Sequence, residues 1–182
     1  MSAPFNLLYP LDTFYAFTGR ALPLATMLEA EEVPEPYHSL LVPEHDMTPT
    51  LEAFHGDRIH LRVLERRLEG AKLSRLVDLV LNEGERPVEF GAIVIHLDHF
   101  PDSGRQALLE GYQPLGTILG DYSIAHRSCP QAYLKVIPDR FISEALALSG
   151  APDLYGRRNL LLTEKGDVIA DIIEILPPAE EG

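Results

Sequence analysis

The chain of 182 residues lacks several features that would assign it to a class at once. It has no tryptophan and a single cysteine, Cys129, so no disulfide can form within the chain, which suits a reducing compartment. We expect Cys129 to be a small buried hydrophobe rather than a nucleophile. No apolar run approaches the ~18 residues that a spanning helix needs, and the N-terminus does not resemble a signal peptide. We therefore expect a cytoplasmic protein with no membrane partner.

Positive charge is also scarce. Fifteen Lys and Arg stand against 28 Asp and Glu, which gives a formal net charge of −13 at pH 7. Such a surface repels phosphate backbones over long distances, so nucleic acid is not an expected partner. It also repels small anions, so an anion site would require local arginines, and the candidates are Arg75, Arg66-Arg67 and Arg157-Arg158.

Motifs of several common chemistries are missing. The chain has no phosphate-binding glycine loop, dinucleotide fingerprint, nucleophile elbow or paired-cysteine metal spacing. His96 and His99 lie three residues apart beside Asp98 at a predicted strand end, where a metal site is conceivable and surface histidines are the simpler interpretation. We predict neither a metal ion nor a cofactor.

The residues that are present are typical of one globular domain. Hydrophobic residues make up 46% and charged residues 24% of the chain, and its length suits one domain. We therefore take residues 1–182 as a single domain. Within it, residues 1–44 are predicted to be a helical wrap, and residues 178–182 a flexible acidic tail. The sequence leaves monomer and homodimer open.

Alternating apolar and polar residues predict strands. They fall at residues 58–64, 73–81, 88–95, 132–137, 158–163 and 168–176. Helices are predicted from Thr48-Pro49, over residues 102–112 and after Asp139. Because short turns join successive strands, the expected fold is α+β, an antiparallel sheet of about six strands with helices on one side.

Two charged residues interrupt apolar strands. Glu174 lies within residues 172–176, where burial would be costly for an ionised carboxylate without a partner. Arg75 shares the parity of Val77 and Leu79, and on an inward face it would suit bidentate binding of a carboxylate. Two alternatives stay open: Glu174 could face water on an edge strand, and Arg75 could form an interstrand salt bridge.

Four segments in order resemble the chorismate pyruvate-lyase family, which makes 4-hydroxybenzoate from chorismate. They are the helix start at Met47-Thr48, the strands from Arg75 to Phe90, the turn Pro114-Leu115-Gly116, and Leu154–Asn159 with the closing strand Glu174–Pro177. The likeness covers residues from about 45 to 177. The chain looks closer to an uncharacterised chorismate lyase-like branch than to the best-known enzymes.

This resemblance implies a cofactor-independent carbon-oxygen lyase that converts chorismate, or a related aromatic acid, into a hydroxybenzoate and pyruvate. Arg75 and Glu174 would be its catalytic residues. Arg75 would bind the ring carboxylate, and Glu174 would face the ring hydroxyl. The side chains of Met47 and Leu115 would form apolar walls around the ring, and nearby backbone N–H groups would donate further hydrogen bonds to the carboxylate.

One part of the family pattern is absent, because its second arginine falls at Ala92 here. Arg157 or Arg158 is therefore the candidate for a second substrate-binding charge. The alternative function is a non-catalytic domain that binds an aromatic carboxylate, as the ligand-sensing domains of transcription regulators do.

Overall fold

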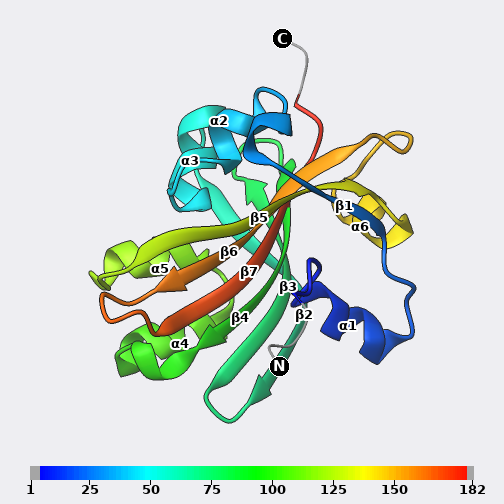
Figure 1. Cartoon of the computed structure of the whole chain (residues 1–182). Helices are drawn as coiled ribbons and strands as arrows, with labels where there is room; N and C mark the ends of the chain where they lie inside the picture. The colour runs from blue at the N-terminus through cyan, green and yellow to red at the C-terminus, as the bar shows by residue number, and fades with distance from the viewer. Residues whose placement is uncertain (1–4, 180–182) are drawn as a thin grey trace.

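The computed structural model describes residues 5–179, and its centre is a seven-stranded antiparallel sheet (Figure 1). The strand order is β1-β5-β6-β7-β4-β3-β2. The strands are β1 (Leu24–Leu28), β2 (Ile59–Glu69), β3 (Lys72–Leu81), β4 (Pro87–His96), β5 (Arg127–Ile137), β6 (Leu154–Leu162) and β7 (Val168–Leu176). The α+β prediction is confirmed, with one strand more than expected.

The extra strand comes from the segment predicted to be a helical wrap. Leu24 to Leu28 pair antiparallel with Tyr133 to Ile137 of β5 and form one edge of the sheet. Among residues 5–44, helices cover only part of the segment. The helical prediction is wrong here, because these residues form a strand by pairing with a distant partner, which no local pattern indicates.

Helices lie on both faces of the sheet rather than on one (Figure 1). On one face are α1 (Leu11–Thr18) and α6 (Arg140–Ala145). On the other are α2 (Tyr37–Leu41), α3 (Met47–His55), α4 (Asp102–Glu110) and α5 (Leu115–Asp121). Two short 3-10 turns, η1 (Ala30–Glu32) and η2 (Leu97–His99), complete the described elements.

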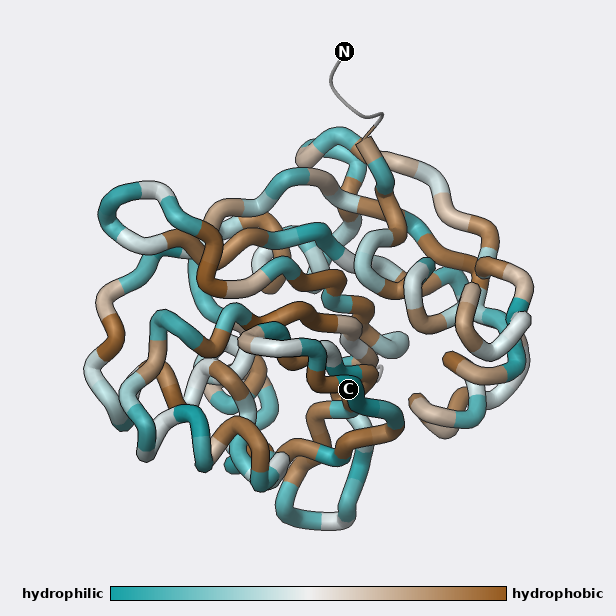
Figure 2. Tube along the Cα trace, turned by 90° about the horizontal axis from the view of Figure 1, so that it is seen from below, coloured by the Kyte–Doolittle hydropathy of each residue, from teal (hydrophilic) through white to brown (hydrophobic). Residues whose placement is uncertain are grey.

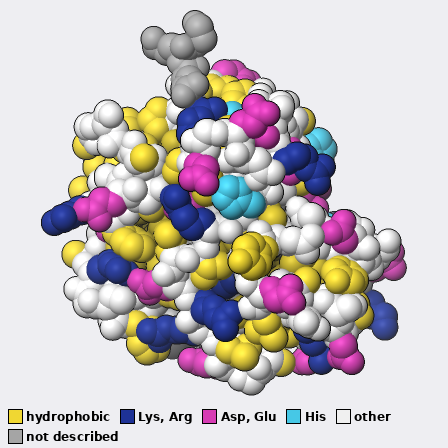
Figure 3. Space-filling view, turned by 180° about the vertical axis from the view of Figure 1, so that it is seen from behind, with side chains coloured by type: hydrophobic (Ala, Val, Ile, Leu, Met, Phe, Trp, Pro, Cys, Tyr) yellow, Lys and Arg dark blue, Asp and Glu magenta, His cyan; other side chains and the backbone are white. Residues whose placement is uncertain are grey.

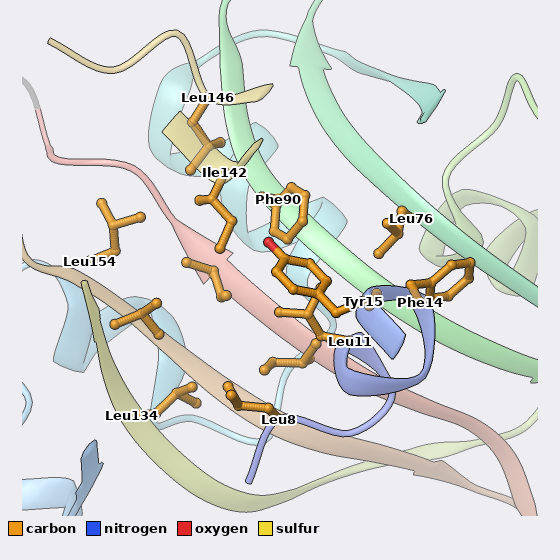
Figure 4. Packing of buried hydrophobic residues seen from close by; sticks show 14 residues of the cluster. Leu8, Leu11, Phe14, Tyr15, Leu76, Phe90, Leu134, Ile142, Leu146 and Leu154 are labelled. Carbon is orange, nitrogen blue, oxygen red and sulfur yellow. The ribbon is translucent and has the colours of Figure 1, made fainter. Parts of the chain in front are cut away.

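The core follows from strands that are covered on both sides. Tyr15 of α1 and Ile142 of α6 lie beside Phe90 of β4, and Phe14 of α1 extends toward Leu76 of β3, as Figure 4 shows. Figure 2 shows hydrophobic positions concentrated in the inner strands and hydrophilic ones in the outer turns. Strands buried on both faces become nearly continuous apolar runs, so a charged residue within one stands out.

The end of the chain is held where the described residues stop. The backbone N–H of Ala179 donates to the Tyr37 hydroxyl at 2.7 Å, and that hydroxyl donates to the Pro177 carbonyl at 3.2 Å. The predicted flexible tail thus begins with ordered residues, and its positions 180–182 lie outside the described residues. None of the helices between residues 5 and 179 has the length and apolar character needed to cross a bilayer.

Candidate functional site

A cavity lies between the sheet and the N-terminal ends of α3 and α5. Its empty volume is about 540 Å³, including the solvent space at its mouth. The lining residues are Asp46, Met47, Thr48, Leu61, Arg75, Val77, Leu79, Glu89, Gly91, Ile93, Pro114, Leu115, Gly116, Asn159, Leu161, Ile172 and Glu174.

The structure therefore brings four of the six predicted site residues to one cavity. Arg75 comes from β3, Glu174 from β7, Met47 from α3 and Leu115 from α5. Their positions span most of the chain, so only the folded sheet and its covering helices place them together.

Arg75 is buried in the cavity without a counter-charge. Its residue is 1% exposed, and among residues 5–179 no carboxylate lies within ion-pair distance of it. Its Nη1 donates to the Leu108 carbonyl at 3.1 Å, while its Nε has no hydrogen-bond partner in the described chain. Burial and the nearby Arg66 lower the pKa of Arg75 to about 10, so the guanidinium stays charged at neutral pH. The interstrand salt bridge is excluded, because the residue opposite is Arg66.

Helix α4 orients this arginine. Arg66 on β2 donates to the Leu109 carbonyl at 2.6 Å, next to the Leu108 carbonyl that Arg75 uses. Both carbonyls belong to the last turn of α4, the partly negative end of the helix dipole. One side of the Arg75 guanidinium is thereby tied to the helix end.

Glu174 lies on a central strand and not on an edge, because β7 is flanked by β4 and β6. The residue is 4% exposed, and its Oε2 accepts a hydrogen bond from Arg157 Nε at 2.5 Å. Arg157 also donates to the carbonyls of Leu41, Pro43 and His45 at 3.0, 3.0 and 2.7 Å. Arg157 therefore fixes Glu174 and the connection between α2 and α3, and it does not line the cavity.

Arg158 cannot contact a ligand in this cavity. Neighbouring residues of a strand point to opposite faces, so Arg158 lies on the far side of the sheet from Arg157. There it binds Asp171 at 2.6 Å, donates to the Asn6 carbonyl, and lies 5.4 Å from the Tyr9 ring centre. The prediction that Arg157 or Arg158 supplies a second substrate contact is thus corrected by their placement.

Glu89 is the cavity residue that sequence reasoning missed. It is 5% exposed on β4, and its Oε2 has no hydrogen-bond partner among residues 5–179. Burial, followed by the neighbouring Glu174, raises its pKa well above the ordinary range. The signal was available, because Glu89 interrupts the apolar run 88–95 as Glu174 interrupts 172–176.

Two helix starts close the cavity. The first-turn N–H groups of α3 and α5 have no acceptor within their own helices, and neither N-cap residue supplies a side-chain hydrogen bond. A Cβ on Gly116 would stand 3.0 Å from the Thr48 side chain, so a glycine lets the two helices approach closely. The cavity thus has donors at its rim in addition to Arg75.

One lining residue, Asp46, interacts with a histidine outside the lining of the cavity. Asp46, which precedes α3, binds His126 Nε2 at 2.6 Å. Burial works against a charged imidazole, but hydrogen bonds to the Ile124 carbonyl and to Asp46 raise the pKa of His126 overall. Within the described chain, no group of three or more His, Cys, Asp or Glu is placed to hold a metal ion.

Comparison with known proteins gives a match in structure but not in sequence. No family model and no curated protein matches the chain. The ligand-binding domain of a GntR-family transcriptional regulator from Bordetella bronchiseptica matches with a TM-score of 0.50 and 14% identity, over 67% of this chain and 87% of that one.

Two further solved structures are similar. PhnF from Mycobacterium smegmatis has a TM-score of 0.57 and 11% identity, covering 74% of this chain and 64% of PhnF. A gene product of Staphylococcus aureus has a TM-score of 0.52 and 8% identity, covering 77% of this chain and 98% of that one. At such low identity the matches show a shared fold, the chorismate lyase-like α+β fold, which in the Bordetella protein is a ligand-binding domain.

Proposed function

We propose that this domain binds a small carboxylic acid in the cavity, with the carboxylate on Arg75. The observation that carries the proposal is the buried guanidinium without an acidic partner. An isolated buried charge costs several kcal/mol, so its retention is best explained by a counter-charge that arrives from outside. A carboxylate matches the planar donor edge of an arginine.

The rest of the cavity favours a flat, partly apolar acid. Val77, Ile93, Met47 and Leu115 supply apolar surface on opposite walls. The start of α3 adds partial positive charge near the same volume. These features support an aromatic carboxylate better than a flexible polar acid. The fold shared with a regulator's ligand-binding domain supports binding as the function.

The first test replaces Arg75 with methionine, which fills a similar volume without charge. Calorimetric binding of benzoate and 4-hydroxybenzoate should weaken at least ~10-fold, about 1.4 kcal/mol. Thermal stability without ligand should hold or increase, because the substitution removes an unpaired buried charge. If Arg75 had only a structural role, the substitution would lower the thermal stability and leave ligand binding unchanged.

Arg140→Met provides the matched control, since Arg140 is exposed and distant in sequence from every lining residue. It should leave binding unchanged. Unaltered affinity in Arg75→Met would contradict the proposal.

Chorismate pyruvate-lyase activity is the second candidate. It is favoured by the placement of two acids, Glu174 and Glu89, in the same cavity as Arg75. In this reaction the ether C–O bond breaks, the hydroxyl-bearing ring carbon loses its hydrogen, and the departing enolpyruvate gains a proton to become pyruvate. The residues would orient the dianion and exclude water, with Glu174 at the ring hydroxyl.

The lyase candidate is tested by a coupled assay for pyruvate release from chorismate. Arg75→Ala should reduce the rate at least ~10-fold, about 1.4 kcal/mol of transition-state stabilisation. Pyruvate no higher than in the enzyme-free control, together with measurable binding of hydroxybenzoate, would leave a binding domain without this activity.

A further inference from the structure

Glu89 occupies the cavity floor in an unusual state for an acid. It lies on β4, between β3 and β7, and nothing in the described chain hydrogen-bonds to its Oε2. Its Oε1 lies 3.3 Å from the point where a Cβ on Gly91 would stand, so the carboxyl group leans over that glycine.

The neighbouring acid differs from Glu89 in having a cation. Arg157 Nε donates to Glu174, and the other hydrogen bonds of Arg157 go to three backbone carbonyls. No cation of the described chain forms an ion pair with Glu89, although the charge of Arg157 acts to lower its pKa. Burial and Glu174 raise the pKa of Glu89, and a protonated carboxyl carries an O–H donor. The cavity then presents a donor, Glu89, beside an acceptor, Glu174.

The strand register separates this pair from Arg75. Arg75 lies opposite Ile93 of β4, while Glu174 lies opposite Gly91. Glu89 lies two residues from Gly91 on β4 and four residues from Ile93, the residue opposite Arg75. Four residues of strand separate the Cα positions of the two levels by about 13 Å. Gly91 lies midway between the levels of Arg75 and Glu89, and because it has no side chain the Glu89 carboxyl group can extend over it toward Arg75.

We propose that Glu89 is a specificity-determining residue that donates a hydrogen bond to an uncharged oxygen of the ligand, at the end remote from the ligand's carboxylate. This inference rests on the proposed binding function and names the ligand class, a rigid hydroxy acid. A hydroxyl is the group that accepts from Glu89 and donates to Glu174 at the same time. A second carboxylate at that end would meet the negative charge of Glu174 and be rejected.

The experiment compares three rigid probes on the full chain: 4-hydroxybenzoate, benzoate and terephthalate. The wild type should bind 4-hydroxybenzoate at least ~10-fold tighter than benzoate, because a site built to pair a hydroxyl leaves its polar groups unpaired without one. Terephthalate should bind more weakly than benzoate. Calorimetry or ligand-detected NMR gives the three dissociation constants.

Variants then isolate Glu89. Glu89→Leu should reduce the preference for the hydroxyl to about twofold while benzoate affinity is retained, which also shows that the variant folds. Glu89→Gln keeps a neutral donor of the same length and should preserve the preference. Glu89→Asp keeps the acid but shortens its reach and should lose most of the preference.

The outcomes separate the two proposals. If Glu89→Leu and Glu89→Asp both keep the wild-type preference while all proteins bind benzoate, the role of Glu89 is refuted and the binding function stands. If the wild type binds none of the probes, both proposals fail.

Discussion

Arg75 and Arg157 lie buried on the same face of the sheet in opposite surroundings. Arg157 makes four hydrogen bonds, one of which is its ion pair with Glu174, so its charge is satisfied within the chain. Arg75 has one backbone acceptor and an unpartnered Nε. A buried arginine with its ion pair and hydrogen bonds made within the chain is compatible with a stable fold. A buried arginine without them carries an uncompensated desolvation cost, which a bound anion would offset.

Asp78 offers a residue-scale test on the other face of the sheet. Its side chain is fully buried, Arg62 donates to Oδ2 at 2.6 and 3.1 Å, and Oδ1 has no partner in the described chain. Burial raises the pKa of Asp78 to about 6, although Arg62 acts in the opposite direction. The folded state therefore binds this proton more tightly than the unfolded chain, whose Asp pKa is 3.8.

Because the folded-state pKa of Asp78 is raised, its ionisation lowers the free energy of unfolding as the pH rises. The contribution of Asp78 to stability is fully present below the unfolded pKa of 3.8 and is lost as the pH rises through about 6. Asp78→Asn removes this loss, so the variant should gain stability relative to the wild type as the pH rises, by up to about 3 kcal/mol. Urea unfolding on both sides of that window measures the gain. Glu144→Gln, at an exposed surface pair, is the control, and an equal trend in both variants would argue against burial as the cause.

Single residues also show what the sequence could predict. Arg75 and Glu174 stood out because each places a charge in an apolar strand, and both line the cavity. Glu89 carries the same signal, because it interrupts the apolar run 88–95. Arg157 and Arg158 were indistinguishable in sequence, since strand parity separates them only when the buried face is known.

At the scale of elements, β6 and β7 approach so closely that one glycine is required. A Cβ on Gly156 would stand 2.3 Å from the Glu174 carbonyl oxygen, which belongs to backbone and cannot move without shifting a strand. Gly156→Ala should therefore destabilise the domain by about 1–3 kcal/mol, the usual range for overpacking. It should also weaken ligand binding, because the strand that carries Glu174 is displaced.

Gly120→Ala is the matched control for this substitution. Gly120 lies in α5 with no atom within 4 Å of its added Cβ, and alanine favours helices by up to about 1 kcal/mol. Chemical denaturation should show neutral or increased stability for this variant. A similar loss in both variants would mean that the close approach at Gly156 is not the cause.

The strand β1 cannot be recognised from its own sequence pattern. Its five residues are mostly exposed and follow prolines, and only pairing with β5, more than a hundred residues away, makes them a strand. The inner strands carried their own signal, because burial on both faces forces a recognisable apolar pattern. Local pattern therefore predicted the central sheet but not its edge.

For the whole molecule, the charge of −13 opposes the anion that the cavity is proposed to bind. Figure 3 shows acidic and basic side chains interspersed on one face of the surface, without a broad basic patch there. The full positive charge that would attract the ligand is that of the buried Arg75, which salt screens little, while the repulsion is long-range and is screened.

The salt dependence of binding tests this balance. Raising ionic strength from about 10 mM to about 150 mM should increase the association rate of 4-hydroxybenzoate, because screening removes repulsion. Stopped-flow measurement gives the rate, and the neutral amide of the same acid should show no change. A steep loss of affinity with salt would instead indicate an exposed basic site.

The sequence by itself determined the fold class, the inner strands, and the two charged residues that mark the cavity. Burial imposes its pattern on local sequence, and an isolated charge in an apolar strand is visible there. The tertiary structure alone decided which arginine has its hydrogen bonds made within the chain, that α1 and α6 cover the second face, and that Glu89 lies near Glu174 with its Oε2 unpartnered in the described chain. These depend on strand register and on contacts between residues far apart in the chain, which no local pattern encodes.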